Sequence, residues 1–164
     1  MSVLISAAEL AAVAGDARLV IVDCRHDLAQ PEAGEAAWRE AHIPGALFMH
    51  LDRDLSAKKT GRNGRHPLPS PQDFVALLGA RGISSAHRVV AYDDAGGMFA
   101  ARLWWMLRWV GHRDAAVLDG GLSAWKAAGG ALDTTVRNLP PTDYPLGVVE
   151  PTLDADAVLA SLED

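Results

Sequence analysis

The chain has 164 residues, of which 49% are hydrophobic and 22% are charged, and its formal net charge is −6. These values fit a single folded domain and argue against nucleic acid or an anionic membrane as a partner, since both favour basic proteins. The single cysteine excludes an internal disulfide and any multi-cysteine metal site. No apolar run reaches the roughly 20 residues of a membrane span, and the N-terminus lacks the basic flank of a secretory signal, so we expect a cytoplasmic protein.

The first half of the chain predicts alternating helices and strands. Ser6 and Glu9 have the spacing of a capping box, which predicts a helix over about residues 7–14. Residues 18–24 form a near-continuous apolar run, the pattern of a strand covered on both faces of a parallel sheet. A short helix over residues 35–41 and a short strand over residues 46–49 are expected next.

The second half continues the alternation. Ser70 followed by Pro71 predicts the start of a helix. The patterns then indicate a strand over 88–92, a helix over 98–110, a strand over 115–118 and a helix over 123–128. Strands that alternate with helices predict an α/β fold with a parallel sheet between two layers of helices.

The turn after the strand at 88–92 is suited to an anion. Residues 93–97 read Asp-Asp-Ala-Gly-Gly and precede a helix, so free backbone N–H groups and the positive end of the helix dipole gather at one point. Asp93 itself supplies a negative charge there. Asp93 could be a general base, but a capping carboxylate that closes the loop needs no outside partner, and we favour this structural role.

The segment 51–69 is the most basic part of an acidic chain. Between Asp52 and His66 it carries five cationic residues, namely Arg53, Lys58, Lys59, Arg62 and Arg65. Its glycine, asparagine and serine content predicts an irregular loop. Such a loop can draw small anions toward a cleft, with Arg62 and Arg65 as candidate binding residues, or it can be an ordinary solvated loop.

Four motifs in order resemble the rhodanese superfamily of sulfurtransferases: VDCR at residues 22–25, AHIPGA at 41–46, the loop and helix YDDAGGMFAARLWWMLRWVGH at 92–112, and LDGGLSAW at 118–125. The third motif is most similar to the N-terminal, non-catalytic half of two-domain thiosulfate and 3-mercaptopyruvate sulfurtransferases. The resemblance implies a three-layer α/β/α fold with a five-stranded parallel sheet. It also implies a reaction without a metal or organic cofactor.

The resemblance further implies roles for particular residues. Asp93 stands at the position where active members of the superfamily carry the nucleophilic cysteine, so this chain alone is expected to be inactive. In mercaptopyruvate sulfurtransferases an aspartate and a histidine of the first domain face the cysteine loop of the second, and Asp52 and His66 match them by position. The implied partners are a second rhodanese domain and a small anionic sulfur donor bound between the two domains.

Other candidate residues are expected to be structural. Cys24 ends an apolar run, so packing is the favoured interpretation over catalysis or redox sensing. His26, His50 and His112 lack metal-ligand spacing, so no metal site is predicted. The tryptophans at 104, 105, 109 and 125 are expected to be packing residues rather than a stacking platform.

The C-terminal segment defines the expected domain organisation. Residues 153–159 repeat the pattern of residues 5–10, so we expect a rhodanese-like domain over 1–137 and, over 138–164, a linker with the start of a second domain. The predicted function is therefore the non-catalytic first domain of a tandem sulfurtransferase. The alternative is a free-standing binding or regulatory domain. A dual-specificity phosphatase shares the fold but also needs a cysteine where Asp93 stands.

Overall fold

The computed structural model describes residues 2–162 and contains a five-stranded, all-parallel sheet in the order β1-β5-β4-β2-β3. The strands are β1 (Leu4–Ile5), β2 (Leu19–Asp23), β3 (Leu47–Phe48), β4 (Arg88–Tyr92) and β5 (Ala115–Leu118). The helices are α1 (Ala7–Val13), α2 (Ala33–Glu40), α3 (Pro71–Ala80), α4 (Met98–Trp109), α5 (Gly121–Ala127) and α6 (Ala155–Ala160).

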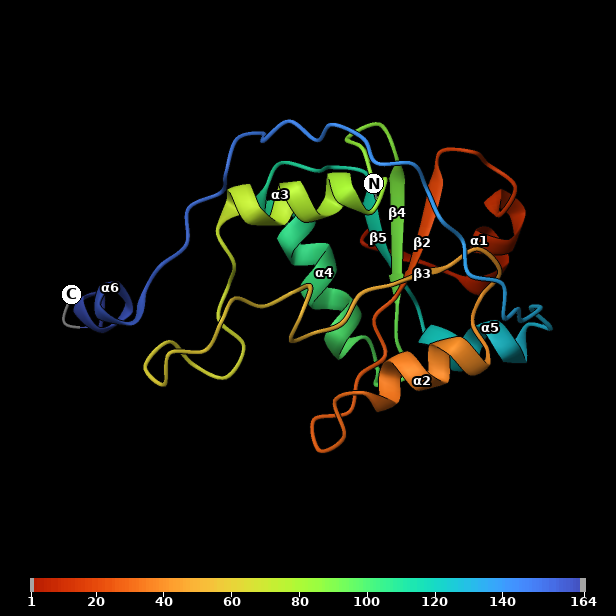
Figure 1. Cartoon of the computed structure of the whole chain (residues 1–164), viewed down its shortest axis with the longest axis horizontal. Helices are drawn as coiled ribbons and strands as arrows, with labels where there is room; N and C mark the ends of the chain where they lie inside the picture. Colours follow the sequence, from red (N-terminus) through yellow and green to blue (C-terminus); the bar gives the residue numbers. More distant parts are fainter. Residues whose placement is uncertain (1, 163–164) are drawn as a thin grey trace.

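The two faces of the sheet are covered by different helices (Figure 1). Successive side chains of a strand point to opposite faces, so Val20 and Val22 pack in one apolar cluster with residues of α3 and α4. Leu19 and Ile21 pack in the other cluster, with residues of α1 and α5. The three-layer arrangement and the five-stranded parallel sheet confirm the fold class expected from the sequence.

The fifth strand is the element that the residue pattern did not locate. β1 has two residues and continues directly into the Ser6 cap of α1, whose capping box with Glu9 is present as expected. It joins the edge of the sheet because the amides of Val117 and Asp119 donate to the carbonyls of Val3 and Ile5. A two-residue strand is too short to show the alternation by which strands are recognised.

A buried polar network ties the ends of the two central strands together. The Tyr92 hydroxyl donates to Asp23 Oδ2 at 2.6 Å, and the Arg25 Nη2 lies 2.7 Å from the same carboxylate. Arg25 also donates to the carbonyl of Ala41, and the amide of Ile43 donates to the Tyr92 hydroxyl. Burial raises the pKa of Tyr92, so its hydroxyl keeps the proton that it donates. The network fixes the chain between α2 and β3 against the end of the sheet where the loops discussed below begin.

The segment after α5 packs along the domain before it reaches α6. It crosses the opposite end of the sheet from the start of α4 (Figure 1), where Thr142 donates to the carbonyl of Gly79 and the Tyr144 side chain is buried. In contrast, α6 contributes no buried residue. The expected boundary at residue 137 stays a prediction. None of the helices within residues 2–162 combines the length and the apolar character needed to cross a bilayer.

His112 holds part of this segment through its side chain. Its Nε2 lies 3.2 Å from the carbonyl of Asp114, which can only accept, so Nε2 carries the proton and Nδ1 accepts from the Tyr144 hydroxyl at 2.7 Å. Burial lowers the pKa of His112, and burial also raises the pKa of Tyr144 to about 12. A proton on Nδ1 would therefore have to enter a buried site where the hydrogen-bond donor is already in place.

We expect the free energy of unfolding to fall as the pH drops through about 6.5, the value for an unperturbed histidine. The sign follows because the folded pKa of His112 is lowered, so the unfolded chain binds the proton first. The same direction holds for His26, His66 and His87. Urea denaturation at pH 7.5, 6.0 and 5.0 measures the slope, and a His112→Gln variant should show a shallower one. Equal slopes for the two proteins would contradict this assignment.

Candidate functional site

The candidate site lies where three neighbouring parallel strands end. β2, β4 and β3 are followed by segments that carry His26, Asp93 and His50, respectively. In open α/β sheets, ligands bind beyond the carboxyl ends of the strands, at the point where successive connections run in opposite directions. That point lies between β2 and β4 here, because the chain goes from β2 outward to β3 and from β4 outward to β5 on the other side.

The Asp93 carboxylate fills the anion-binding loop after β4. Its Oδ1 accepts from the amides of Ala95 and Gly97, at 2.9 and 2.8 Å. Its Oδ2 accepts from the amides of Phe99 and Ala100, at 2.8 and 2.9 Å. Asp93 is fully buried, and α4 has no other side-chain cap because the residue at its N-terminus is Gly97 with φ of 88°. Asp93 therefore caps α4 from several residues upstream.

A second helix, α5, begins beside Asp93. The carbonyl of Asp93 accepts from the amide of Leu122 at 2.9 Å, which places the N-terminus of α5 beside the same loop. Gly121 is required there, since a Cβ at this position would lie 2.3 Å from the Asp93 carbonyl oxygen and its φ is +56°. The positive ends of two helices thus converge on one residue whose charge already occupies the loop.

Asp52 and His66 face each other across the base of the basic segment. His66 Nδ1 lies 3.2 Å from Asp52 Oδ1, and the Lys59 ammonium lies 3.3 Å from the same oxygen. Burial opposes ionisation of Asp52, but Lys59, His66 and His26 outweigh it, so the Asp52 pKa is lowered. Burial lowers the pKa of His66 despite the attraction of Asp52. A neutral imidazole therefore lies beside an ionised carboxylate at neutral pH.

Two further histidines lie against this pair. His26 Nε2 lies 4.0 Å from Asp52 Oδ2, and its ring meets that of His50 edge to face, with 5.2 Å between the ring centroids. Both side chains are 1% exposed. Burial, and then the nearby His50, lower the pKa of His26. Sequence spacing did not indicate this cluster, because the histidines follow different strands and meet only through the order of the sheet.

The donor set of this cluster resembles a metal site in composition. The nearest nitrogen or oxygen atoms of His26, His50 and Asp52 lie within 4.8 Å of one another. However, His50 Nδ1 accepts from the amides of Asp52 and Arg53, so the proton of the neutral ring is on Nε2, which lies 3.7 Å from Glu32. A metal ligand needs a free lone pair. The hydrogen bonding of His50 therefore fits a structural role better than metal coordination.

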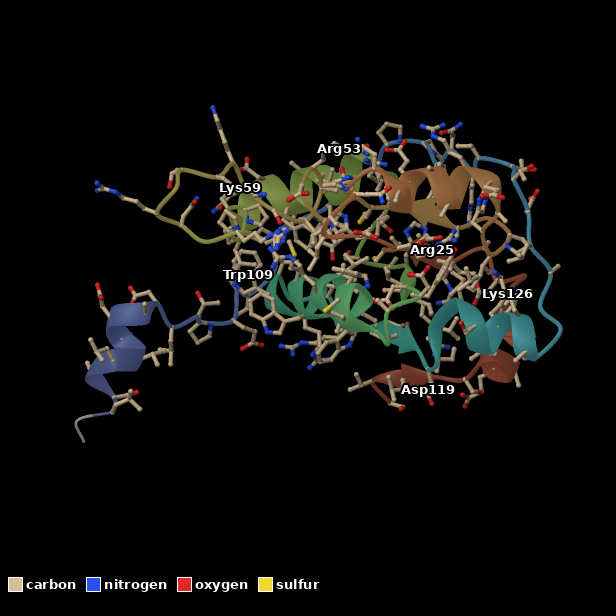
Figure 2. All side chains as sticks on the ribbon, turned by 90° about the horizontal axis from the view of Figure 1, so that it is seen from below. Arg25, Arg53, Lys59, Trp109, Asp119 and Lys126 are labelled. Carbon is tan, nitrogen blue, oxygen red and sulfur yellow. The ribbon has the colours of Figure 1, made fainter. Side chains whose placement is uncertain are left out.

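The cations of the basic segment differ in their contacts, and Figure 2 labels two of them, Arg53 and Lys59. Arg53 lies beside α2, where it pairs with Glu32 and Glu35. Arg65 donates to the carbonyl of Leu28, whereas the side chain of Arg62 is exposed. Both side chains are exposed, and within residues 2–162 neither forms a hydrogen bond or an ion pair with Asp52.

Cys24 follows β2, but its thiol packs in the apolar core and not in the candidate site. The thiol is 1% exposed and belongs to the apolar cluster beneath α3 and α4. Burial, reinforced by Asp23 and Asp93, raises its pKa well above the ordinary value. The thiolate that a sulfur nucleophile requires is therefore disfavoured.

We expect Asp93→Ala to destabilise the domain by on the order of 3 kcal/mol, because four amides, two of them buried, lose their acceptor. Asp94→Ala, at the exposed neighbouring position, should change stability by less than about 0.5 kcal/mol. Thermal unfolding measures both. Sulfate or formate should stabilise Asp93→Ala more than the parent chain, since either anion can occupy the vacated loop. Equal melting temperatures for the two variants would contradict the capping role.

Comparison with known proteins identifies the family. The rhodanese-like domain family matches residues 6–128 of this chain. A Pseudomonas aeruginosa protein named "Probable 3-mercaptopyruvate sulfurtransferase" is 48% identical over 143 residues, which cover 86% of this chain and 50% of that protein. "Thiosulfate/3-mercaptopyruvate sulfurtransferase 2" of Arabidopsis thaliana is 42% identical over 125 residues, 76% of this chain and 36% of that protein.

The structural comparison agrees. The crystal structure of the Escherichia coli protein SseA, described as a 3-mercaptopyruvate sulfotransferase, matches with a TM-score of 0.85 and 26% identity, over 100% of this chain and 63% of that one. The chain spans half or less of the length of the two curated relatives. On the match over residues 6–128 and the shared parallel sheet, this chain belongs to the rhodanese-like domain family.

Proposed function

We propose that this chain acts as the non-catalytic first domain of a tandem thiosulfate or 3-mercaptopyruvate sulfurtransferase. A second rhodanese domain would carry the cysteine that holds the sulfur as a persulfide. The first domain would supply one wall of the cleft in which a small anionic sulfur donor binds. A cytoplasmic location remains a prediction from the sequence.

The observation that carries the proposal is the state of the Asp93 loop. Sulfur transfer requires a nucleophile that can hold a second sulfur atom, and a carboxylate cannot do so. The four backbone N–H groups that could activate a thiolate or bind an oxyanion already donate to Asp93. Cys24, the one cysteine of the sequence, is buried with a raised pKa. Both features support a role other than that of the nucleophile.

The Asp52–His66 pair supports a role in the reaction of a neighbouring domain. With 3-mercaptopyruvate, a cysteine thiolate attacks the donor sulfur, an S–S bond forms, and the C–S bond breaks with its electron pair passing to carbon. The resulting pyruvate enolate takes up the proton that the donor thiol carried. A neutral imidazole held beside an ionised carboxylate can carry that proton from sulfur to carbon, as His66 beside Asp52 could.

Thiosulfate makes a different demand. Attack on its outer sulfur forms the persulfide and expels sulfite with the electron pair, and no proton changes place. An acceptor such as cyanide then removes the outer sulfur as thiocyanate and restores the thiolate. Here the first domain would contribute only attraction of the anionic donor, for which Arg62 and Arg65 on the basic segment are the proposed residues.

We expect the isolated chain to lack thiosulfate:cyanide sulfurtransferase activity, because its loop has no thiol. In Asp93→Cys, the helix N-termini should lower the pKa of the new thiol, giving a thiolate that iodoacetamide alkylates faster than it alkylates Cys24, whose pKa is raised. Its transferase activity should stay weak, since Asp94 remains nearby and the loop has no cationic side chain. Thiocyanate release by the parent chain that is abolished by Cys24→Ser would overturn the proposal.

We expect His66→Ala, in a protein that also contains the second domain, to lower turnover of 3-mercaptopyruvate about a hundredfold, the usual size of a proton-transfer contribution. Turnover of thiosulfate should change by no more than about twofold, because that step moves no proton. Steady-state kinetics with both donors measures the difference.

Lys58→Ala, an exposed change on the same segment, is the matched control and should leave turnover of both donors unaltered. Charge reversal at Arg62 or Arg65 should raise the apparent KM for both donors and flatten its dependence on salt. Unchanged kinetics for His66→Ala with both donors would reduce the domain to a structural support and favour a free-standing binding or regulatory role.

A further inference from the structure

Arg102 makes a set of contacts that the proposed reaction does not use. It lies in the second turn of α4, and its guanidinium donates almost entirely to backbone carbonyls. Nε and Nη2 donate to the carbonyl of Leu55, at 3.0 and 2.7 Å. Nη2 also donates to the carbonyls of His66 and Pro67, at 3.0 and 3.4 Å. Among the described ion pairs, none joins Arg102 to a carboxylate.

These carbonyls belong to the two ends of one loop. Leu55 closes the turn that starts at His50, because the Leu55 amide donates to the His50 carbonyl, and this turn carries Asp52. His66 and Pro67 lie at the other end of the loop. The ends also meet directly, since the amide of Ala57 donates to the carbonyl of Pro67 at 2.9 Å. Arg102 therefore binds both ends of the loop to α4 through hydrogen bonds.

The side chains presented by the two ends are those of the candidate pair. Asp52 projects from the turn whose last residue, Leu55, accepts from Arg102. At the other end of the loop, the carbonyl of His66 itself accepts from Arg102. Their 3.2 Å separation depends on the spacing of the two backbone segments, because the intervening residues 58–65 form an exposed, irregular loop. A flexible loop alone would let the imidazole and the carboxylate drift apart.

The chemistry of the contact suits arginine. A planar guanidinium presents several N–H donors in a fixed arrangement, so one side chain can bridge carbonyls from two segments. A lysine has a compact ammonium on a flexible stem and would reach fewer of them. Placing an unpaired cation in a half-buried position costs desolvation, and the carbonyl oxygens offset it.

We propose that Arg102 is the positioning residue of the Asp52–His66 pair, an inference that rests on the function proposed above. Arg102 touches neither substrate nor the reacting atoms. It acts by holding the two ends of the basic segment at the distance that sets the pair. Asp93 caps α4, and Arg102 projects from the same helix. Helix α4 therefore connects the Asp93 loop to Asp52 and His66, the side chains proposed to act on the donor bound by the other domain.

The test begins with this chain, without any activity assay. Arg102→Lys keeps the positive charge and removes the planar set of N–H donors, whereas Arg102→Met removes both the charge and the donors. In each variant, hydrogen exchange of the Ala57 amide should accelerate at least tenfold, and the NMR titration of His66 should move toward the ordinary histidine pKa as burial is lost. The use of lysine matters because the charge of Arg102 itself contributes to the lowered pKa of His66.

Arg108→Met is the matched control. Arg108 lies on the same helix, and its guanidinium stacks 5.7 Å from the Trp104 ring centroid rather than on the loop. It should leave the Ala57 exchange and the His66 titration unchanged. If Arg102→Met fails to fold, Arg102→Lys and Arg102→Gln carry the test. Unaltered exchange and titration in a folded Arg102 variant would overturn the proposal.

The second readout uses the protein with both domains. Arg102→Met should lower kcat for 3-mercaptopyruvate by about tenfold to a hundredfold, the range expected when a catalytic group is displaced by about an ångström. KM and the thiosulfate reaction should change little, and Arg102→Lys should restore part of kcat. A rise in KM alone would contradict positioning. Loosening of the loop with unchanged turnover would keep Arg102 as the positioning residue and instead overturn the reaction role proposed for the pair.

Discussion

The arrangement of the site depends on one carboxylate that accepts four backbone hydrogen bonds. Asp93 satisfies the first amides of α4 and, through its own carbonyl, an amide at the start of α5. Buried amides without an acceptor destabilise a fold, and the negative charge of Asp93 also interacts favourably with the positive N-terminal ends of the two helices. The residue thus sets the direction in which both helices leave the sheet. A loop geometry that is suited to binding an anion therefore binds the protein's own Asp93 and connects two helices to the sheet.

The alternation of elements was readable from the sequence because each central strand is a continuous apolar run. Residues 18–24 and 88–92 gave β2 and β4, and the cap at Ser70 gave the start of α3. The residue pattern did not locate β1, since two residues carry no period and its pairing with β5 is a contact distant in sequence. The expected start of α5 near residue 123 was also late, because Gly120 and Gly121, both with positive φ, turn the chain directly into the helix.

The candidate site was only partly readable, for the same physical reason. Asp93, Asp52 and His66 were singled out by local pattern and by resemblance, and the last two lie in contact. His26 and His50 were set aside because their spacing fits no ligand motif, yet parallel strands bring their ends together regardless of sequence separation. No pattern in the sequence indicated that Arg102 would contact the basic segment. An arginine in an amphipathic helix usually faces solvent, and only the folded loop supplies the carbonyls that it binds.

The burial of Cys24 has a consequence for how the domain responds to oxidants. The sequence contains one thiol, and in the fold that thiol is enclosed by apolar side chains and disfavoured as a thiolate. Disulfides and thiol-directed electrophiles act on exposed thiolates, so the one cysteine of the sequence offers them no accessible target in the fold. In the proposed tandem protein, thiol chemistry would therefore be confined to the partner domain. Reversible oxidation of a thiol there would leave the packing of this domain unchanged.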